Sequence, residues 1–397
     1  MIPIYADLHI HIGRTEKGIP VKISGSRNLT FHNIAHEASE RKGLAMIGII
    51  DCHSPAVQED IASMLDRGEM EPLPGGGLRY RSTTVILGSE IEVREEGMGP
   101  AHVLAYLPDF DAMRRFTEWM SRHVTNIQLS SQRIYAPARK LQEEVAAHGG
   151  ILVPAHVFTP HRGVYGAAAE RMAELFDLGQ LAAVELGLSA DTEMAGYLSE
   201  LDPFTFVTNS DAHSLAKIGR EYNRIALAEP NFRELVMALK REEGRRVEAN
   251  YGLNPRLGKY HRTYCADCES ILDESGISAD TCPRCGSRHI VRGVMDRIHS
   301  IADRKEPFVP DWKAPYYYQV PLEFIPGLGR KTLNRLLDRF GTEMNILHQV
   351  PEEELAEAAG EDTARWIVLA RQGRLEIGAG GGGKYGRVVH PDENGKQ

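Results

Sequence analysis

The sequence predicts an α/β protein with three parts: a barrel of strands and helices, a small zinc-binding module and an α-helical C-terminal domain. Three observations support this fold class. Apolar runs that end in metal-ligating side chains alternate with helical patterns over about the first 230 residues. Two Cys-x-x-Cys pairs follow in the second half of the chain. After them, a Gly-Leu-Gly turn leads into an amphipathic, basic helical pattern.

The composition is typical of a globular protein without membrane spans. A chain of 397 residues is too long for one ordinary domain, so two or three are expected. Hydrophobic residues make up 42% and charged residues 25%, as in soluble proteins. No apolar run approaches the roughly 18 residues of a transmembrane helix, and the N-terminus starts directly with a strand rather than a secretory signal. We therefore expect a cytoplasmic protein.

The net charge of −9 is unevenly distributed along the chain. Residues 245–397 carry 22 basic and 22 acidic side chains, so the whole excess of acid lies in residues 1–244. An acidic N-terminal domain is what a cluster of divalent cations would neutralise. The acidic total therefore does not exclude nucleic-acid binding by the second half.

The N-terminal segment predicts a strand with two histidines on one face. Alternate residues from Ile4 to Ile12 are apolar, which places His9 and His11 together on the opposite face. Two imidazoles on one strand face are close enough to hold a metal ion. The alternative is a strand with two surface histidines.

Metal-ligating groups also follow the later predicted strands. The apolar run 45–50 is followed by Asp51-Cys52-His53, and the run 84–90 ends in Glu90, a carboxylate that could bridge two metals. Barrel enzymes place their chemistry at such C-terminal strand ends. The remaining strands contribute, in chain order, His102, His156, Glu185, Asp211 and His213. We interpret the series as a multi-metal site. His161 follows no predicted strand and is expected to be an ordinary surface histidine.

Loops and helices complete the first part. Arg14 and Lys22 follow the two histidines and suit a phosphate-bearing substrate, although a solvated loop is an equally good interpretation. Thr30 predicts the N-cap of a helix over residues 31–42. A long helical region is expected over residues 111–148, with a polar break at 126–133 as a candidate functional loop.

The two Cys-x-x-Cys pairs predict a structural zinc site. The pairs are about 13 residues apart, and four thiolates at this spacing suit one tetrahedral zinc. Four sulfurs leave no open position, so this zinc should not be catalytic. A redox dithiol is the alternative. Arg284 and Arg288, on and after the second pair, are a candidate phosphate-binding patch or a solvated charged face. The four predicted ligands are Cys265, Cys268, Cys282 and Cys285.

The segment 321–331 resembles the helix-hairpin-helix DNA-binding motif. Its glycines, Gly327 and Gly329, let backbone N–H groups approach a phosphate at a helix N-terminus. The helix that follows is expected to present basic residues, and a helical hairpin that only packs on the barrel is the alternative. The residues expected to bind DNA here are Gly327, Gly329, Arg330, Lys331 and Arg335.

The strand-end residues together resemble the polymerase-and-histidinol-phosphatase (PHP) family. The resemblance implies a seven-stranded, distorted β/α barrel with up to three metal ions, in which His11, Glu90 and Asp211 carry the catalysis. It assigns His9, His11, Glu90 and Asp211 to one metal, His53, Glu90 and His102 to a second, and His156 and His213 to a third. Histidines favour zinc or manganese, and the carboxylates would also accept magnesium.

The order of barrel, four-cysteine module and helix-hairpin-helix resembles the endonuclease Q family over nearly the whole chain. We expect the parts to span residues 1–244, 245–300 and 301–397. The resemblance implies a DNA repair endonuclease that hydrolyses the phosphodiester 5′ of a deaminated base (uracil, hypoxanthine or xanthine) or an abasic site. Metal-activated water would be the nucleophile, and the damaged nucleotide would be flipped out of the duplex. Damaged DNA is the expected partner of a monomer, with a replication clamp as a further candidate.

Two other functions remain open at this point. One is a PHP-family phosphatase or 3′–5′ exonuclease in which the C-terminal modules serve another purpose. Only an endonuclease would cut a closed circular duplex at a single uracil. The other is a non-catalytic DNA-binding protein, which should hold no metal beyond the zinc of the four cysteines.

Overall fold

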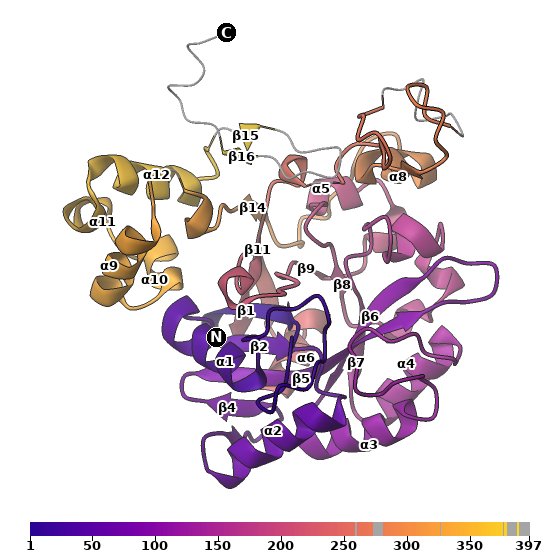
Figure 1. Cartoon of the computed structure of the whole chain (residues 1–397), viewed down its shortest axis with the longest axis horizontal. Coiled ribbons are helices and arrows are strands. Elements are labelled where there is room, and N and C mark those ends of the chain that lie inside the picture. The colour runs from indigo at the N-terminus through magenta and orange to yellow at the C-terminus, as the bar shows by residue number, and fades with distance from the viewer. Residues whose placement is uncertain (259, 273–280, 326, 376, 379–386, 389–397) are drawn as a thin grey trace.

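The structure is a computed structural model that describes all residues except 259, 273–280, 326, 376, 379–386 and 389–397. Figure 1 shows a large α/β body with two smaller groups above it, the cysteine-bearing segment before α8 and the helices α9 to α12. Among the described residues, no helix has both the length and the apolar character needed to cross a membrane.

Seven strands of the described chain form the predicted barrel. Strands β1, β2 and β5 are parallel, and β6 is antiparallel to both β5 and β7. The ring closes through a bridge between Leu152 and Leu181, the parallel pair β8–β9, and a bridge between Ile10 and Ala212. The barrel strands are β1 (Ile2–Ile10), β2 (Met46–Ile49), β5 (Thr83–Val93), β6 (Ala101–Leu107), β7 (Ile151–Pro154), β8 (Val184–Glu185) and β9 (Phe206–Val207).

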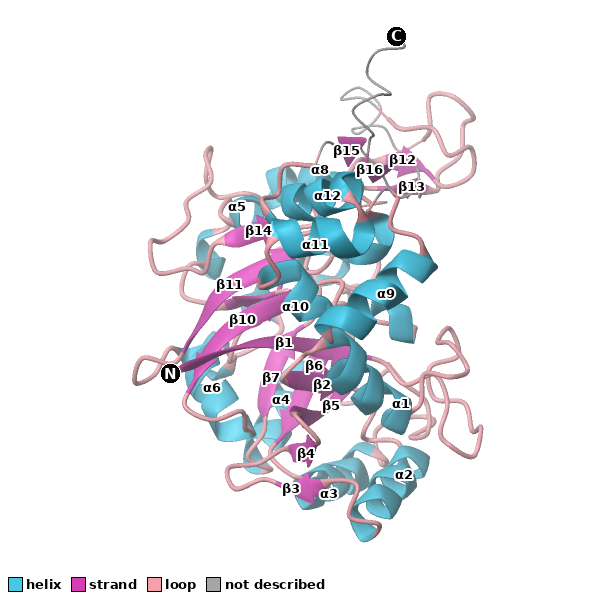
Figure 2. Ribbon diagram, turned by 90° about the vertical axis from the view of Figure 1, so that its left-hand side faces the viewer, coloured by secondary structure: helices cyan, strands magenta, loops and turns pink. Residues whose placement is uncertain are grey.

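Further strands extend the barrel sheet beyond β1. Strand β10 is antiparallel to the first half of β1, and β11 and β14 continue the sheet outward, as Figure 2 shows. The sheet therefore continues past residue 244, where the first part was expected to end. The remaining strands are β3 (Glu71–Pro72), β4 (Leu78–Tyr80), β10 (Tyr222–Leu227), β11 (Arg246–Gly252), β12 (Tyr264–Cys265), β13 (Ile290–Val291), β14 (Tyr316–Tyr318), β15 (Ile377–Gly378) and β16 (Arg387–Val388).

A register shift in β1 changes the strand pattern expected from the sequence. The pairing of β1 with β2 shifts between Asp7 and Ile10. The buried hydrophobic residues form two clusters. Before the shift, Leu8 packs in one cluster with Ile86 and Leu104, which lie on the interior face of β5 and β6. After the shift, Ile10 packs in the second cluster. The expectation that Ile4 to Ile12 share one face was therefore wrong. A bulge of this kind re-aims side chains, and here it turns His9 and His11 inward.

Helices cover the outside of the barrel. Helix α1 continues into the π-helix η1, and the predicted cap is confirmed because the Asn33 N–H donates to Thr30 Oγ1 at 3.3 Å. The helical region expected over 111–148 has the predicted polar break, but the break is longer than 126–133: residues 121–137 are irregular, and Pro137 disfavours helix in the residue before it. The helices are α1 (Phe31–His36), η1 (Glu37–Lys42), α2 (Pro55–Asp66), α3 (Phe110–Met120), α4 (Ala138–Ala147), α5 (Thr192–Ala195) and α6 (Phe232–Lys240).

The C-terminal helices pack on the barrel next to β1 and β10. The buried Lys42 ammonium lies 2.9 Å from Glu343, and the Tyr222 hydroxyl lies 2.7 Å from Nε2 of His348. These helices are α9 (Arg330–Phe340), α10 (Glu343–His348), α11 (Glu352–Ala359) and α12 (Glu361–Arg371). Helix α8 (Val294–Ile301) lies apart from them, where the Nε of its Arg297 donates to the Tyr165 carbonyl oxygen at 2.8 Å. Short turns complete the chain: η2 (Val164–Ala168), η3 (Met172–Glu174), η4 (Leu178–Gln180), η5 (Ser199–Leu201), η6 (Leu215–Lys217), η7 (Pro255–Leu257) and η8 (Leu322–Phe324).

Candidate metal centre

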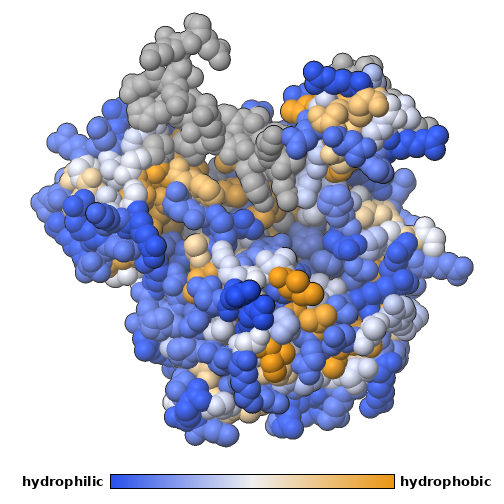
Figure 3. Space-filling model, in the orientation of Figure 1, coloured by the Kyte–Doolittle hydropathy of each residue, from blue (hydrophilic) through white to orange (hydrophobic). Residues whose placement is uncertain are grey.

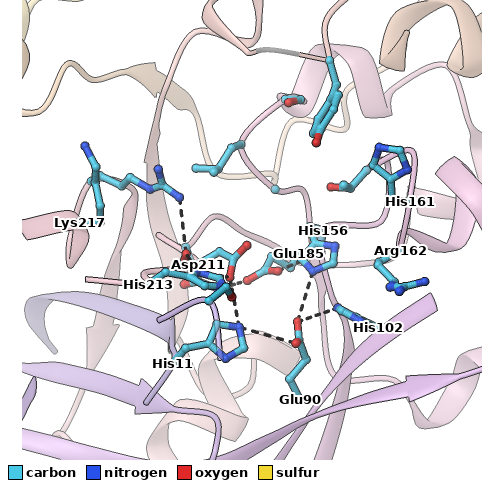
Figure 4. Close-up of a pocket in the computed structure, with 18 of the residues that line it drawn as sticks. His11, Glu90, His102, His156, His161, Arg162, Glu185, Asp211, His213 and Lys217 are labelled. Carbon is cyan, nitrogen blue, oxygen red and sulfur yellow. Dashed lines mark hydrogen bonds and ion pairs between the residues drawn. The ribbon is translucent and has the colours of Figure 1, made fainter. Parts of the chain in front are cut away.

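A cavity of about 550 Å³ opens at the ends of the barrel strands. Figure 4 shows the imidazoles and carboxylates of several strands pointing into it. Glu90 lies at the centre of the group and is almost fully buried. The predicted residues that line the cavity are His11, Lys22, Glu90, His102, His156, Asp211 and His213. The cavity is therefore built from residues that are far apart in the chain.

The two β1 histidines face two carboxylates. Nε2 of His9 lies 3.5 Å from both Glu90 Oε1 and Asp211 Oδ1. Nε2 of His11 lies 3.6 Å from Glu90 Oε2 and 3.3 Å from Asp211 Oδ1. The structure thus brings together the four residues that the sequence assigned to one metal.

The structure groups the other ligands differently from the sequence-based assignment. His102 and His156 lie 2.9 Å and 3.4 Å from the same oxygen of Glu90. His213 instead joins His11 and Asp211, with its Nδ1 3.6 Å from Asp211 Oδ1. The expected pairing of His156 with His213 was wrong, because β6 and β7 are neighbours whereas His213 follows β9.

His53 does not join any of these groups. Its Nδ1 lies 2.7 Å from the Ser89 hydroxyl and its Nε2 lies 3.2 Å from the Leu129 carbonyl oxygen. Both ring nitrogens are therefore occupied by protein groups. The structure therefore does not support the assignment of His53 to a metal with Glu90 and His102.

Two ligand positions have backbone conformations that are rare for residues other than glycine. His156 has a φ of 30° and Asp211 a φ of 46°. The Glu185 carboxylate accepts the His156 N–H at 2.9 Å, and a Cβ at Gly187 would lie 2.6 Å from the Cβ of His156. Such strained residues persist only where surrounding contacts hold them, and they are concentrated at functional sites.

Two buried carboxylates behind the cluster orient the β1 histidines. Glu185 Oε1 lies 3.0 Å from Nδ1 of His9, and Asp51 Oδ2 lies 3.1 Å from Nδ1 of His11. A carboxylate on Nδ1 leaves Nε2 free to bind a metal. Both carboxylates belong to the predicted series of strand-end residues, but neither was assigned to a metal or to a catalytic role.

Opposite charges in the cluster shift the pKa values of its members. Burial would raise the pKa of Glu90, but His102 and Lys22 hold it well below its ordinary value. The pKa of Asp211 is likewise held well below its ordinary value, because His9 outweighs burial. Burial lowers the pKa of His102. The cluster therefore offers ionised carboxylates and a neutral imidazole at neutral pH.

The donor set fits divalent cations. Several buried nitrogens and oxygens that point at one another have no hydrogen-bond partner within the described chain, a costly state unless another group binds them. These atoms are His9 Nε2, His11 Nε2, His102 Nδ1 and Asp211 Oδ1. Nitrogen and carboxylate donors are the ligands that zinc and manganese prefer.

Comparisons with known proteins identify the family. A family profile described as PHP-associated matches residues 192–243. The uncharacterized protein YqxK of Bacillus subtilis (strain 168) is 49% identical over 391 residues, which cover 98% of this chain and 100% of YqxK. PfuEndoQ, a lesion-specific endonuclease from Pyrococcus furiosus, has a TM-score of 0.85 and 31% identity over 100% of this chain and 97% of its own. This chain belongs to the endonuclease Q family.

A second endonuclease Q structure matches this chain equally well. It is a complex with a 27-mer duplex that carries an abasic lesion at the active site, and its TM-score is 0.85 at 31% identity. The match covers 100% of this chain and 98% of that one. The family resemblance and the fold class predicted from the sequence are both confirmed.

The four predicted cysteines meet at one point. Their sulfurs all lie within 4.8 Å of one another, with Sγ–Sγ distances of 3.6 Å between Cys265 and Cys285 and 3.7 Å between Cys268 and Cys282. The first knuckle begins in β12, and β12 pairs with β13 after the second knuckle. The arrangement is that of a closed four-thiolate site.

The predicted DNA-binding residues lie in three separate places. Arg14 folds back onto the Gly18 carbonyl oxygen, whereas the Lys22 ammonium lies 3.3 Å from Glu90, inside the metal centre. Arg284 and Arg288 are exposed in the four-cysteine segment. The exposed hairpin and helix residues lie on and before α9, and they are Gly327, Gly329, Arg330, Lys331 and Arg335.

Several residues of the cavity rim were missed by the sequence analysis. His161, expected to be an ordinary surface histidine, lines the cavity together with Arg162 (Figure 4). Lys217 and Arg220 line the side next to Asp211, and the Arg220 Nε donates to the Ser210 carbonyl oxygen at 2.8 Å. These residues follow the strand ends by several positions, so no strand-end pattern marks them.

Proposed function

We propose that this chain is a metal-dependent DNA repair endonuclease that cuts the phosphodiester on the 5′ side of a deaminated base or an abasic site. One observation supports the proposal above the others. A single cluster contains Glu90, His11 and Asp211, and each of these residues contacts at least two other candidate metal ligands. The cluster lies in a chain that matches a lesion-specific endonuclease over its whole length.

The catalytic metals would be held by three overlapping ligand sets. The first is His9, His11 and Glu90, the second is Glu90, His102 and His156, and the third is His11, Asp211 and His213. When bound, zinc, manganese or magnesium would neutralise phosphate charge and lower the pKa of a water molecule. A structural zinc would occupy the four-cysteine site, where no open position remains.

Side chains of the cavity would position the phosphodiester. Lys22 reaches the metal centre, where its ammonium lies 2.6 Å from the Ser131 hydroxyl. Lys217 lies on the Asp211 side of the cavity and Arg162 on the opposite side (Figure 4). Arg220 also lines the cavity, and its guanidinium donates to the Asp211 carbonyl oxygen at 3.5 Å. Cations on both sides can hold the two phosphates that flank a displaced nucleotide. A cavity of about 550 Å³ is within the range that encloses small ligands.

The start of helix α9 would bind the DNA backbone away from the cut. Gly329 is its N-cap, and a Cβ placed on Gly329 would meet no atom within 4 Å. The N-terminal N–H groups of the helix are therefore open to a phosphate. Arg330, Lys331 and Arg335 are exposed beside it and have no carboxylate partner among the described residues.

An internal lesion tests the proposal. End-labelled duplexes, each with one uracil, hypoxanthine, xanthine or abasic site, are incubated with the full-length protein and Mn²⁺ or Mg²⁺. We expect one cut on the 5′ side of the lesion and none in the undamaged duplex. A covalently closed circle with a single uracil is the control for end-dependent cutting. A protein that removes only terminal nucleotides or phosphates would leave the circle intact, and the proposal would then be wrong.

A further inference from the structure

A tight turn beside the metal centre carries an unusually exposed isoleucine. The Gly25 N–H donates to the Lys22 carbonyl oxygen at 2.9 Å, which closes a turn with Ile23 at its tip. The Ile23 side chain is 79% exposed, more than any other large hydrophobic side chain that the structure describes. The face shown in Figure 3 is mostly hydrophilic, with hydrophobic groups gathered over its centre and upper left. The exposure of Ile23 is therefore a feature that needs an explanation.

The turn is held firmly against the metal centre. The Lys22 N–H donates to the Ile12 carbonyl oxygen at 2.8 Å, and the Ser26 N–H donates to that of His213 at 2.9 Å. Two glycines allow this contact, because a Cβ on Gly13 would lie 2.0 Å from the Ser26 carbonyl oxygen. A Cβ on Gly25 would lie 2.9 Å from the Cα of Gly13. The position of Ile23 is therefore built into the packing.

The neighbours of Ile23 place it at the rim of the cavity. Lys22 and Ser24 both line the cavity, while Ile23, between them, does not. The Lys22 ammonium reaches Glu90 at 3.3 Å. An apolar side chain thus projects into solvent one residue away from a group that contacts the metal cluster.

We propose that Ile23 is a wedge that enters the base stack of duplex DNA at the damaged nucleotide. The inference rests on the proposed function, since it requires a lesion inside a duplex. A base that leaves the stack opens a gap, and apolar side chains inserted between base steps stabilise such unstacked DNA. Isoleucine suits this role because its branched side chain is stiff, so little conformational freedom is lost on insertion. Ile23 acts here as a positioning residue, whereas the chemistry belongs to the metal cluster.

The test compares a paired lesion with one that needs no unstacking. Ile23→Ala is assayed with Mn²⁺ on a duplex with one uracil and on the same strand unpaired. We expect kcat/KM to fall about tenfold on the duplex, which corresponds to roughly 1.4 kcal/mol, and to stay within about twofold on the single strand. Ile23→Leu should restore most of the duplex activity. Ile19→Ala is the matched control, because Ile19 is 39% exposed in the same loop but its neighbours Gly18 and Pro20, unlike those of Ile23, do not line the cavity.

A fluorescent base gives a second readout. 2-Aminopurine next to the uracil emits more strongly when unstacked, so wild-type protein should raise the signal and Ile23→Ala should raise it less. Equal activity of Ile23→Ala and wild type on the duplex, or equal losses on both substrates, would overturn the wedge while leaving the endonuclease intact. If the wild-type protein cuts neither substrate, the proposed function itself is wrong.

Discussion

Nδ1 of His9 lies 3.0 Å from Oε1 of Glu185, and both side chains are buried. The same carboxylate accepts the Asn209 amide at 2.7 Å and the His156 N–H at 2.9 Å. Glu185 therefore fixes the ring of one ligand and the backbone of another.

Substitution Glu185→Gln should weaken metal binding without unfolding the barrel. Outer partners of ligand histidines typically change metal affinity by about 10- to 100-fold, and we expect a loss in this range for Mn²⁺ or Zn²⁺ by titration calorimetry. Glu143→Gln on the exposed face of α4 is the matched control. An unchanged affinity in Glu185→Gln would show that this carboxylate is only a packing residue.

Removal of the Asp211 carboxylate should abolish cutting. Its Oδ1 faces His9 and His11, so its loss removes a negative charge from beside both β1 ligands. We expect a rate loss of at least about a thousandfold, because several kcal/mol of metal-dependent stabilisation disappear and each 1.4 kcal/mol or so is tenfold. Asp211→Asn is the better variant, since asparagine tolerates the φ of 46° and alanine does not. DNA binding by fluorescence anisotropy should remain, and a fully active variant would contradict the assignment.

The basic residues of α9 should contribute salt-dependent DNA affinity. Lys331→Ala and Arg335→Ala should each weaken binding equally for damaged and undamaged duplex. Each should also reduce the slope of log Kd against log salt by about 0.9, the value for one lost phosphate contact. Arg79→Ala, at an exposed position of β4, is the control. If the salt dependence of Kd were unchanged in both variants, α9 would not contact the DNA backbone.

Loss of one thiolate should remove one zinc ion per chain. Cys265→Ser breaks the four-sulfur cluster, so we expect zinc released into a chromogenic chelator to fall by one equivalent relative to wild type. Cys52→Ala is the matched control, because Cys52 is buried in the barrel and lies outside the cluster. If Cys265→Ser retained its full zinc content, the cysteines would not be zinc ligands.

Glu221 should make the protein less stable as the pH rises. Burial raises the pKa of this carboxyl from 4.5 to about 8, against the lowering effect of hydrogen bonds from Thr208 and Leu253. The folded state therefore keeps a proton that the unfolded state releases. The stabilising contribution is complete below pH 4.5 and is lost as the pH rises to about 8.

Substitution Glu221→Gln removes this titration while keeping a neutral side chain of the same shape. We expect its free energy of unfolding to decrease less than that of wild type between pH 5 and pH 8, by up to roughly 4 kcal/mol at about 1.4 kcal/mol per pH unit. Urea titrations at the two pH values measure the difference. Glu229→Gln, at an exposed position, should follow wild type. Parallel pH curves for Glu221→Gln and wild type would show that the carboxyl ionises freely.

The sequence by itself determined which residues could do chemistry. Apolar runs with a period of two or with continuous hydrophobicity depend on near neighbours in the chain, so the strand ends that carry His9, Glu90 and Asp211 were predictable. The spacing of the four cysteines and the apolar positions of α9 are local in the same sense. Burial of Leu333, Leu336 and Leu337 confirms that helix pattern.

Only the tertiary structure decided how those residues combine. The bulge in β1 turns His9 and His11 inward, and the neighbouring positions of β5, β6 and β7 bring His156 rather than His53 to Glu90. Ser89 and Leu129 then occupy both nitrogens of His53. A metal site needs atoms within a few ångströms of one another, and that condition depends on which strands pair and in what register. Those pairings are set by the packing of the whole barrel, which no local stretch of sequence encodes.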